Sequence, residues 1–197
     1  MDRLFVRLAL YVVRFAGAVA GVWGVAYAVN GATQAGGEIV VRVVPRPGAA
    51  DRLGLSGVKL PRGLSLGGGE LSLRVWDSTA AEQMLYRADV MVGGLCALVA
   101  ALLVGGLLTS VFAGEPYRRG NAARVAWLAV LALVSGAAQA LPALAVAAVL
   151  DRAGAGGTFG PPSGLSWPPF TGAALLAALA LALRAGRRAR ADVPSVA

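Results

Sequence analysis

The chain has 197 residues, of which 57% are hydrophobic and 14% are charged, and its formal net charge at pH 7 is +8. A soluble domain carries about 25% charged residues, whereas here the charges are missing over long blocks and dense between them. Uncharged apolar blocks of about 20 residues are typical of helices that cross ~30 Å of hydrocarbon. The composition therefore excludes an ordinary soluble domain and predicts an all-α transmembrane protein, a four-span helical bundle with a small β-containing domain outside the membrane.

The first predicted element, residues 1–29, is a cytoplasmic N-terminus followed by span 1. Arg3 and Arg7 also resemble the basic start of a secretory signal peptide, and the Ala-Tyr-Ala at 26–28 resembles its cleavage site. Arg14 interrupts the apolar run, which favours an uncleaved helix over the cleaved alternative. Arg14 is a candidate intramembrane polar residue, and we expect its long side chain to reach the lipid headgroups.

Residues 30–89 form the one sizeable segment outside the spans. β-Branched residues at 38–44 and alternating Leu, Leu and Val at 70–76 predict two strands, and 58–60 predicts a short third one. Glycine and proline runs separate these strands. We expect a small extracytoplasmic sheet of two to four strands, whose core is too thin to be stable without support from other parts of the protein.

A helix is expected to follow directly. Thr79 and Glu82 have the spacing of a capping box, in which each side chain bonds to the backbone N–H of the other residue. The sequence predicts one continuous helix over 80–112, of which 90–112 is span 2.

The stretch "GEPYRRGNAARV" begins at Gly114 and contains most of the predicted cytoplasmic loop 113–124. Gly114 favours a left-handed helix end, and Pro116 prevents the helix from continuing. We expect the arginines to contact anionic lipid, each contributing ~1 kcal/mol near the surface. Docking of a protein partner is the alternative, in which Asn121 would cap the next helix. The candidate interaction or lipid-contact residues are Pro116, Tyr117, Arg118, Arg119 and Asn121.

The spacing Gly-x-Pro-Tyr-x-x-x-Asn at 114–121 resembles the Gly-x-Pro-Phe-x-x-x-Asn loop of a bacterial four-helix membrane-protein family, domain of unknown function 2975. The number of spans, the long first outer loop and the basic tail are also similar. In this chain Tyr117 stands in place of the phenylalanine. The tail also lacks the acidic ending associated with that family. The resemblance implies an inner-membrane protein with no established activity, often encoded beside a small helix-turn-helix regulator that would be its cytoplasmic partner.

Span 3 is predicted at 125–150, and the Gly/Pro-rich segment 151–165 is predicted to be a flexible outer loop. Gln139 lies in this span three residues before Pro142, which frees a backbone carbonyl one turn earlier. Gln139 is the second candidate intramembrane polar residue. A structural hydrogen bond to a neighbouring helix is favoured, and a ligand or proton site is the alternative.

Span 4 is predicted at 166–184, followed by a basic cytoplasmic tail at 185–197. The excess positive charge lies in the N-terminus, the 113–124 loop and this tail, with little in the other two gaps. Because basic residues favour the cytoplasmic side, both termini should be cytoplasmic. The abundance of Ala, Gly and Arg suggests a GC-rich bacterial genome, and the family resemblance implies the bacterial cytoplasmic (inner) membrane. The same topology explains the net charge without nucleic acid as a partner.

Small residues mark the predicted helix faces: Gly17 and Gly21 in span 1, Gly93, Gly94, Gly105 and Gly106 in span 2, and Ala174, Ala178 and Ala182 in span 4. Small residues let helices approach closely in lipid. The pattern predicts tight packing, either within one chain or by self-association.

Several features argue against catalysis. The chain has no histidine and one cysteine, Cys96, so neither the usual titrating residue nor a Cys/His metal cluster is present. We predict no enzyme activity, cofactor or metal. The sequence favours an interaction, sensing or accessory protein whose partners are lipids and another protein chain. The alternative is a channel or transporter subunit for a small ligand, built around Gln139 and Arg14.

Overall fold

The structure is a computed structural model that describes residues 3–54, 70–162 and 164–191. The predicted strand at 58–60 and the end of the basic tail lie outside the described residues. The elements in chain order are α1 (Arg3–Ala32), β1 (Ile39–Pro45), α2 (Ala49–Arg52), β2 (Leu71–Val75), α3 (Ala80–Tyr86), α4 (Ala88–Phe112), α5 (Asn121–Ala138), α6 (Leu141–Arg152), β3 (Phe159–Gly160) and α7 (Pro168–Ala191). The described chain is mostly helical with a small sheet, as predicted.

Four helical stretches are long and apolar enough to cross a membrane: Leu4–Ala32, Ala88–Phe112, Asn121–Arg152 and Pro168–Ala189. The third stretch combines α5 and α6. The chain divides into two compact units. Unit 1 comprises Met1–Ala26, Val90–Ala138 and Ser166–Ala197, and unit 2 comprises Tyr27–Asp89 and Gln139–Leu165.

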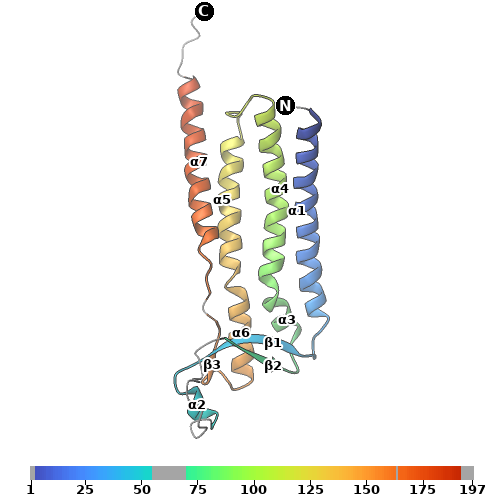
Figure 1. The fold of residues 1–197 in the computed structure, drawn as a ribbon, viewed down its shortest axis with the longest axis vertical. Helices are drawn as coiled ribbons and strands as arrows, with labels where there is room; N and C mark the ends of the chain where they lie inside the picture. The colour runs from blue at the N-terminus through green and yellow to red at the C-terminus, as the bar shows by residue number, and fades with distance from the viewer. Residues whose placement is uncertain (1–2, 55–69, 163, 192–197) are drawn as a thin grey trace, which may run out of the picture. The chain divides into compact units, whose positions relative to one another are not determined.

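Unit 1 is a bundle in which α1, α4, α5 and α7 lie side by side in that order (Figure 1). Glycines bring α1 and α4 into backbone contact. A methyl group built on Gly24 would lie 2.7 Å from the carbonyl oxygen of Val90, and one built on Gly94 would lie 3.1 Å from the Cα of Gly24. The small-residue faces of these two helices therefore pack within one chain, and small residues are what allow such a close approach.

The beginning of α1, the end of α7 and one loop lie near one another within unit 1. The start of α1, the loop from α4 to α5 and the C-terminal end of α7 occupy the same end of the bundle (Figure 1). Side-chain packing agrees, because a methyl group built on Gly186 of α7 would lie 2.7 Å from the ring of Tyr117 in that loop. The described parts of the segments predicted to be cytoplasmic thus lie at one end of the bundle.

Unit 2 contains a three-stranded antiparallel sheet with the order β2-β1-β3. Ile39 pairs with Val75 and Val43 pairs with Leu71, which confirms the two longer predicted strands. The third strand, β3, comes from the segment 151–165. That segment was predicted to be a flexible loop, and this prediction was wrong at Phe159–Gly160, because backbone pairing with β1 holds these residues in place.

The core of unit 2 is formed by the buried face of β1 and one face of α6. Ile39, Val41 and Val43 alternate along the strand and pack against Val146 and Leu150. Val146 and Leu150 are four residues apart and share one helix face. Both residues lie in the stretch predicted as span 3, and they also form part of the core against the sheet.

Two helices predicted to be continuous are broken. The helix expected over 80–112 divides at Arg87, whose N–H bonds to the carbonyl of Met84. The helix expected over 125–150 divides at the turn Gln139–Ala140. Pro142 explains the second break, because proline has no N–H to donate to the carbonyl of Ala138 and its ring clashes with that carbonyl.

Candidate functional site

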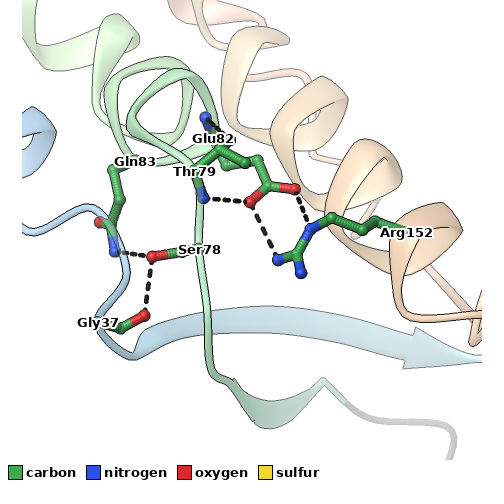
Figure 2. Close-up of polar contacts among 6 residues, drawn as sticks. All are labelled: Gly37, Ser78, Thr79, Glu82, Gln83 and Arg152. Carbon is green, nitrogen blue, oxygen red and sulfur yellow. Dashed lines mark hydrogen bonds and ion pairs between the residues drawn. The ribbon is translucent and has the colours of Figure 1, made fainter.

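A cluster of polar side chains begins at the N-terminus of α3 in unit 2 (Figure 2). Thr79 is the N-cap, and its hydroxyl accepts a 3.1 Å hydrogen bond from the N–H of Glu82. The N–H of Thr79 donates in return to Glu82 Oε2 at 2.8 Å. The capping box predicted from the sequence is confirmed, and it fixes the direction of the Glu82 side chain.

Glu82 also forms a paired contact with Arg152 at the end of α6. Arg152 Nε lies 2.8 Å from Glu82 Oε1, and its Nη2 lies 3.1 Å from Oε2. The Glu82 side chain is 8% exposed and that of Arg152 is 37% exposed. Burial raises the pKa of Glu82, but the hydrogen bonds from Arg152 and Thr79 and the positive charge of Arg152 outweigh it, so the pKa lies below its ordinary value of 4.5. The ion pair joins α3 to α6.

Gln83 extends the cluster toward β1. Its amide nitrogen donates to Ser78 Oγ at 2.7 Å and to the carbonyl of Glu38 at 3.3 Å. Ser78 Oγ donates in turn to the carbonyl of Gly37 at 2.8 Å (Figure 2). Both Gln83 and Ser78 are almost fully buried. Because buried amides and hydroxyls need partners, this chain of bonds fixes the start of β1 against α3.

Arg87 connects the same cluster to the end of α1. Its guanidinium lies 5.5 Å from the ring centre of Tyr27 and donates to Gln34 Oε1 at 3.1 Å. It also donates to the carbonyl of Gln83 at 3.2 Å. Gly31 leaves the space for this side chain, because a methyl group there would overlap it. The polar groups of this cluster bond to one another and so join α1, α3, α6 and β1. This geometry is that of a structural contact between elements.

The loop from α4 to α5 in unit 1 begins with a left-handed helix end. Gly114 has a φ of 77°. Its N–H bonds to the carbonyl of Val111 at 3.0 Å, and the N–H of Glu115 bonds to that of Ser110 at 2.9 Å. This pair of bonds is a Schellman motif. The predicted role of Gly114 is confirmed, and Pro116 follows two residues later.

Asn121 was predicted to cap α5, and the structure corrects this. The N–H of Arg124 bonds to the carbonyl of Gly120, so Gly120 precedes the helix and Asn121 is its first residue. The Asn121 amide nitrogen instead donates to Ser110 Oγ at 2.6 Å and to the carbonyl of Pro116 at 3.0 Å. Asn121 is 1% exposed, so it joins the end of α4 to the loop and α5.

The basic residues of this loop have different environments. Arg124 donates at 3.0 Å to both the carbonyl of Gly106 and Asn121 Oδ1, so it packs against α4. Arg118 and Arg119 are exposed, and Arg118 lies 4.0 Å from Glu115. Two of the three arginines therefore remain available for a lipid surface or a partner, as the sequence suggested.

The remaining candidates are placed as follows. Tyr117 is partly exposed and packs on Gly186 of α7. Arg14 is exposed in α1, with its guanidinium beside Gly105 of α4, where a methyl group would lie 3.4 Å from Arg14 Nε. Gln139 is half-buried at the turn between α5 and α6 and belongs to unit 2, whereas Arg14 belongs to unit 1.

Sequence reasoning missed Arg152 as the partner of Glu82. The available clue was the apolar spacing of Val146 and Leu150. An apolar helix face that is followed by a charged residue is also typical of a helix that packs on the core of a soluble domain. Within the described residues, no group of three or more His, Cys, Asp or Glu side chains is placed to hold a metal ion.

The described residues form a mostly helical protein with four helical stretches long and apolar enough to span a membrane and a small three-stranded sheet. No family model, curated protein or solved structure matches the chain. The similarity of the 114–121 loop to the four-helix family therefore stays a prediction.

Proposed function

We propose that the chain is a non-enzymatic, multi-pass protein of the bacterial cytoplasmic membrane that acts in interaction or sensing. Both termini and the 113–124 loop face the cytoplasm, and unit 2 lies outside. The arrangement of unit 1 supports this topology, because the N-terminus, the loop and the end of α7 share one end of the bundle (Figure 1). The basic residues of these segments then face the cytoplasm, as is usual.

The third crossing in this proposal is α5 alone. Its 18 residues correspond to ~27 Å at ~1.5 Å per residue, close to the ~30 Å of a hydrocarbon core. α6 then belongs to the outer unit, where Val146 and Leu150 contribute to the core of the sheet. This assignment explains why one apolar stretch contains two helices.

The observation that carries the functional proposal is the composition of unit 2. Residues 27–89 and 139–165 are separated by α4 and α5 and still share one core and the ion pair between Glu82 and Arg152. A change in this outer unit would therefore act on helices α1, α4 and α5 through covalent connections. That layout suits a protein that responds to, or holds, a partner outside the membrane.

The inner end supplies the second contact surface of the proposal. Arg118 and Arg119 are exposed beside a loop whose shape is fixed by Asn121. Lysine preserves the charge of arginine but lacks its planar fork of donors. A lipid surface should accept either residue, whereas a protein partner of the kind that the family resemblance implies should distinguish them.

The test is co-purification from native membranes in mild detergent, with the mass of the complex measured. We compare the wild-type protein with Arg118→Lys/Arg119→Lys, with Tyr117→Ala and with Trp76→Ala, at the exposed residue that follows β2. The proposal is supported if the wild-type mass exceeds that of one chain plus detergent and if a substitution at Trp76 or in the loop lowers it. The substitution that lowers the mass identifies the contact surface. A single-chain mass for the wild-type protein contradicts the proposal.

A further inference from the structure

A long apolar groove runs between α5 and α7 of unit 1. Its volume is about 450 Å³, within the range of about 300–1,000 Å³ that is usual for small-molecule sites. Small side chains create its depth, since Ala129, Ala173 and Ala180 are buried at its base. The exposed Leu181 also lines it. The groove is therefore open, deep and almost wholly apolar.

The shape of the groove fits an extended chain. Phe170 and Arg184 both line it, and the helix between them is ~21 Å long at ~1.5 Å per residue. Half of a hydrocarbon core is about 15 Å. A groove of this length can follow one leaflet of a bilayer from its headgroups to its middle.

The charge of the groove is confined to one end. Arg184 is its only charged lining residue, and within the described part of the chain it makes no ion pair with a carboxylate. Arg187 and Arg188 follow on the same helix and are exposed. An apolar groove that ends at a guanidinium with no carboxylate partner among the described residues is complementary to a molecule with a hydrocarbon chain and an anionic head.

We propose that this groove holds one acyl chain of an anionic phospholipid and that Arg184 binds the phosphate. The inference rests on the proposed insertion of unit 1 into the membrane. A second copy of the chain fits the groove less well. Two chains with the same orientation would bring their Arg184, Arg187 and Arg188 side chains to the same depth, where like charges repel.

The experiment uses the full-length protein, purified in an uncharged detergent and titrated with phosphatidylglycerol or with phosphatidylcholine of the same chain composition. Native mass spectrometry counts bound lipids. We expect one retained phosphatidylglycerol per chain and weaker retention of phosphatidylcholine. Arg184→Gln should lower the affinity for phosphatidylglycerol about fivefold. Arg188→Gln, the matched control on the same helix, should change it by less than about twofold, because Arg188 does not line the groove and its charge is screened at the exposed surface.

A second pair of variants tests the groove itself. Ala177 lines the groove and Ala178 does not, and both are exposed on α7. Ala177→Phe should abolish retention of the lipid, and Ala178→Phe should leave it unchanged. Circular dichroism checks that each variant is folded. If Ala177→Phe does not fold, the comparison of Arg184→Gln with Arg188→Gln tests the lipid site.

Three results would overturn the proposal: equal retention of both lipids, equal effects of Arg184→Gln and Arg188→Gln, or a dimer that Ala177→Phe dissociates. Cysteine labelling in cells measures insertion independently of lipid retention. A protein that is inserted as proposed but binds both lipids equally would contradict only the lipid site.

Discussion

In unit 1 the deeply buried side chains include the alanines Ala101, Ala173 and Ala180, whereas in unit 2 they include Val41, Val43 and Leu150. The exposed surface differs as well. Unit 1 exposes large apolar side chains along its helices, such as Phe15 and Leu175, each 72% exposed. Unit 2 carries ion pairs on its sheet, including Arg74 with Glu38 at 3.3 Å.

This difference indicates two kinds of packing within one chain. Lipid tails are as apolar as leucine, so helices in a bilayer gain little from burying large side chains and associate through small ones. In water, stability comes from removing Val, Ile, Leu and Phe from solvent. The burial pattern of unit 1 therefore supports the proposed insertion, and that of unit 2 supports an aqueous location.

The most severe expected defect is in the core of unit 2. Leu150→Ala removes a buried side chain beneath the sheet and should lower the free energy of unfolding of unit 2 by about 2–5 kcal/mol. Hydrogen exchange of the β1 amides measures this. The control is Leu144→Ala on the same helix, where the side chain is 57% exposed and the effect should stay within about 0.5 kcal/mol. Equal effects would show that α6 does not pack as described.

The next test concerns the polar junction of unit 1. Asn121→Ala leaves the carbonyl of Pro116 and the hydroxyl of Ser110 without the amide donor. This should lower the free energy of unfolding of unit 1 by about 1–3 kcal/mol. SDS-induced unfolding, followed by circular dichroism, measures the change. Asn30→Ala, at an exposed asparagine of α1, serves as the control and should have little effect. If both variants unfold at the same SDS concentration, the buried bonds of Asn121 contribute nothing measurable.

Adjacent glycines of α4 test the small-residue packing. A methyl group on Gly94 would overlap the backbone of Ala20, whereas one on Gly93 has its nearest neighbour at 3.9 Å, Ser135 Oγ. Gly94→Ala should therefore destabilise the bundle by about 1–2 kcal/mol, and Gly93→Ala should be neutral or slightly stabilising, since alanine favours helices. The same SDS assay compares them. A stable Gly94→Ala protein would refute the close approach of α1 and α4.

The smallest expected effect comes from the ion pair of unit 2 and depends on pH. The folded-state pKa of Glu82 is lowered from 4.5, so its contribution is present above about pH 4.5 and is lost as the pH falls toward the folded-state pKa. Glu82→Gln should lower the free energy of unfolding of unit 2 by about 1 kcal/mol at pH 7, and it should make that free energy depend less on pH in acid. Glu115→Gln, which removes the exposed ion pair with Arg118, should change neither the free energy of unfolding nor its pH dependence. Identical acid unfolding of wild type and Glu82→Gln would contradict this assignment.

Several features could be predicted because they depend on local sequence. The four apolar stretches, the alternation of β2, the capping box of Thr79 and the helix end at Gly114 each follow from residues within a few positions of one another. The structure bears out all four. Local steric and hydrogen-bonding rules were sufficient for these elements.

Other features depend on partners distant in sequence and could not be predicted from a local pattern. Val146 and Leu150 are as apolar as residues that face lipid, and only the presence of β1 beside α6 shows that they form a water-excluded core. The bonds of Asn121 to Ser110, the Glu82–Arg152 pair and the groove between α5 and α7 likewise require tertiary contacts. The helix break at Arg87 has no proline or glycine beside it in the sequence. The break at Gln139 follows from Pro142, but the sequence alone did not show that the chain enters another unit there.

The most direct test of the account is cysteine accessibility in intact cells. In a Cys96→Ala background, single cysteines replace Ser72 in β2, Gly164 before α7, and Ala113 after α4. An impermeant thiol reagent should label the first two positions, and it should label the third only after the cells are opened. Labelling of Ala113→Cys in intact cells, or protection of both Ser72→Cys and Gly164→Cys, would contradict the proposed separation of an aqueous outer unit from a bundle that spans the membrane.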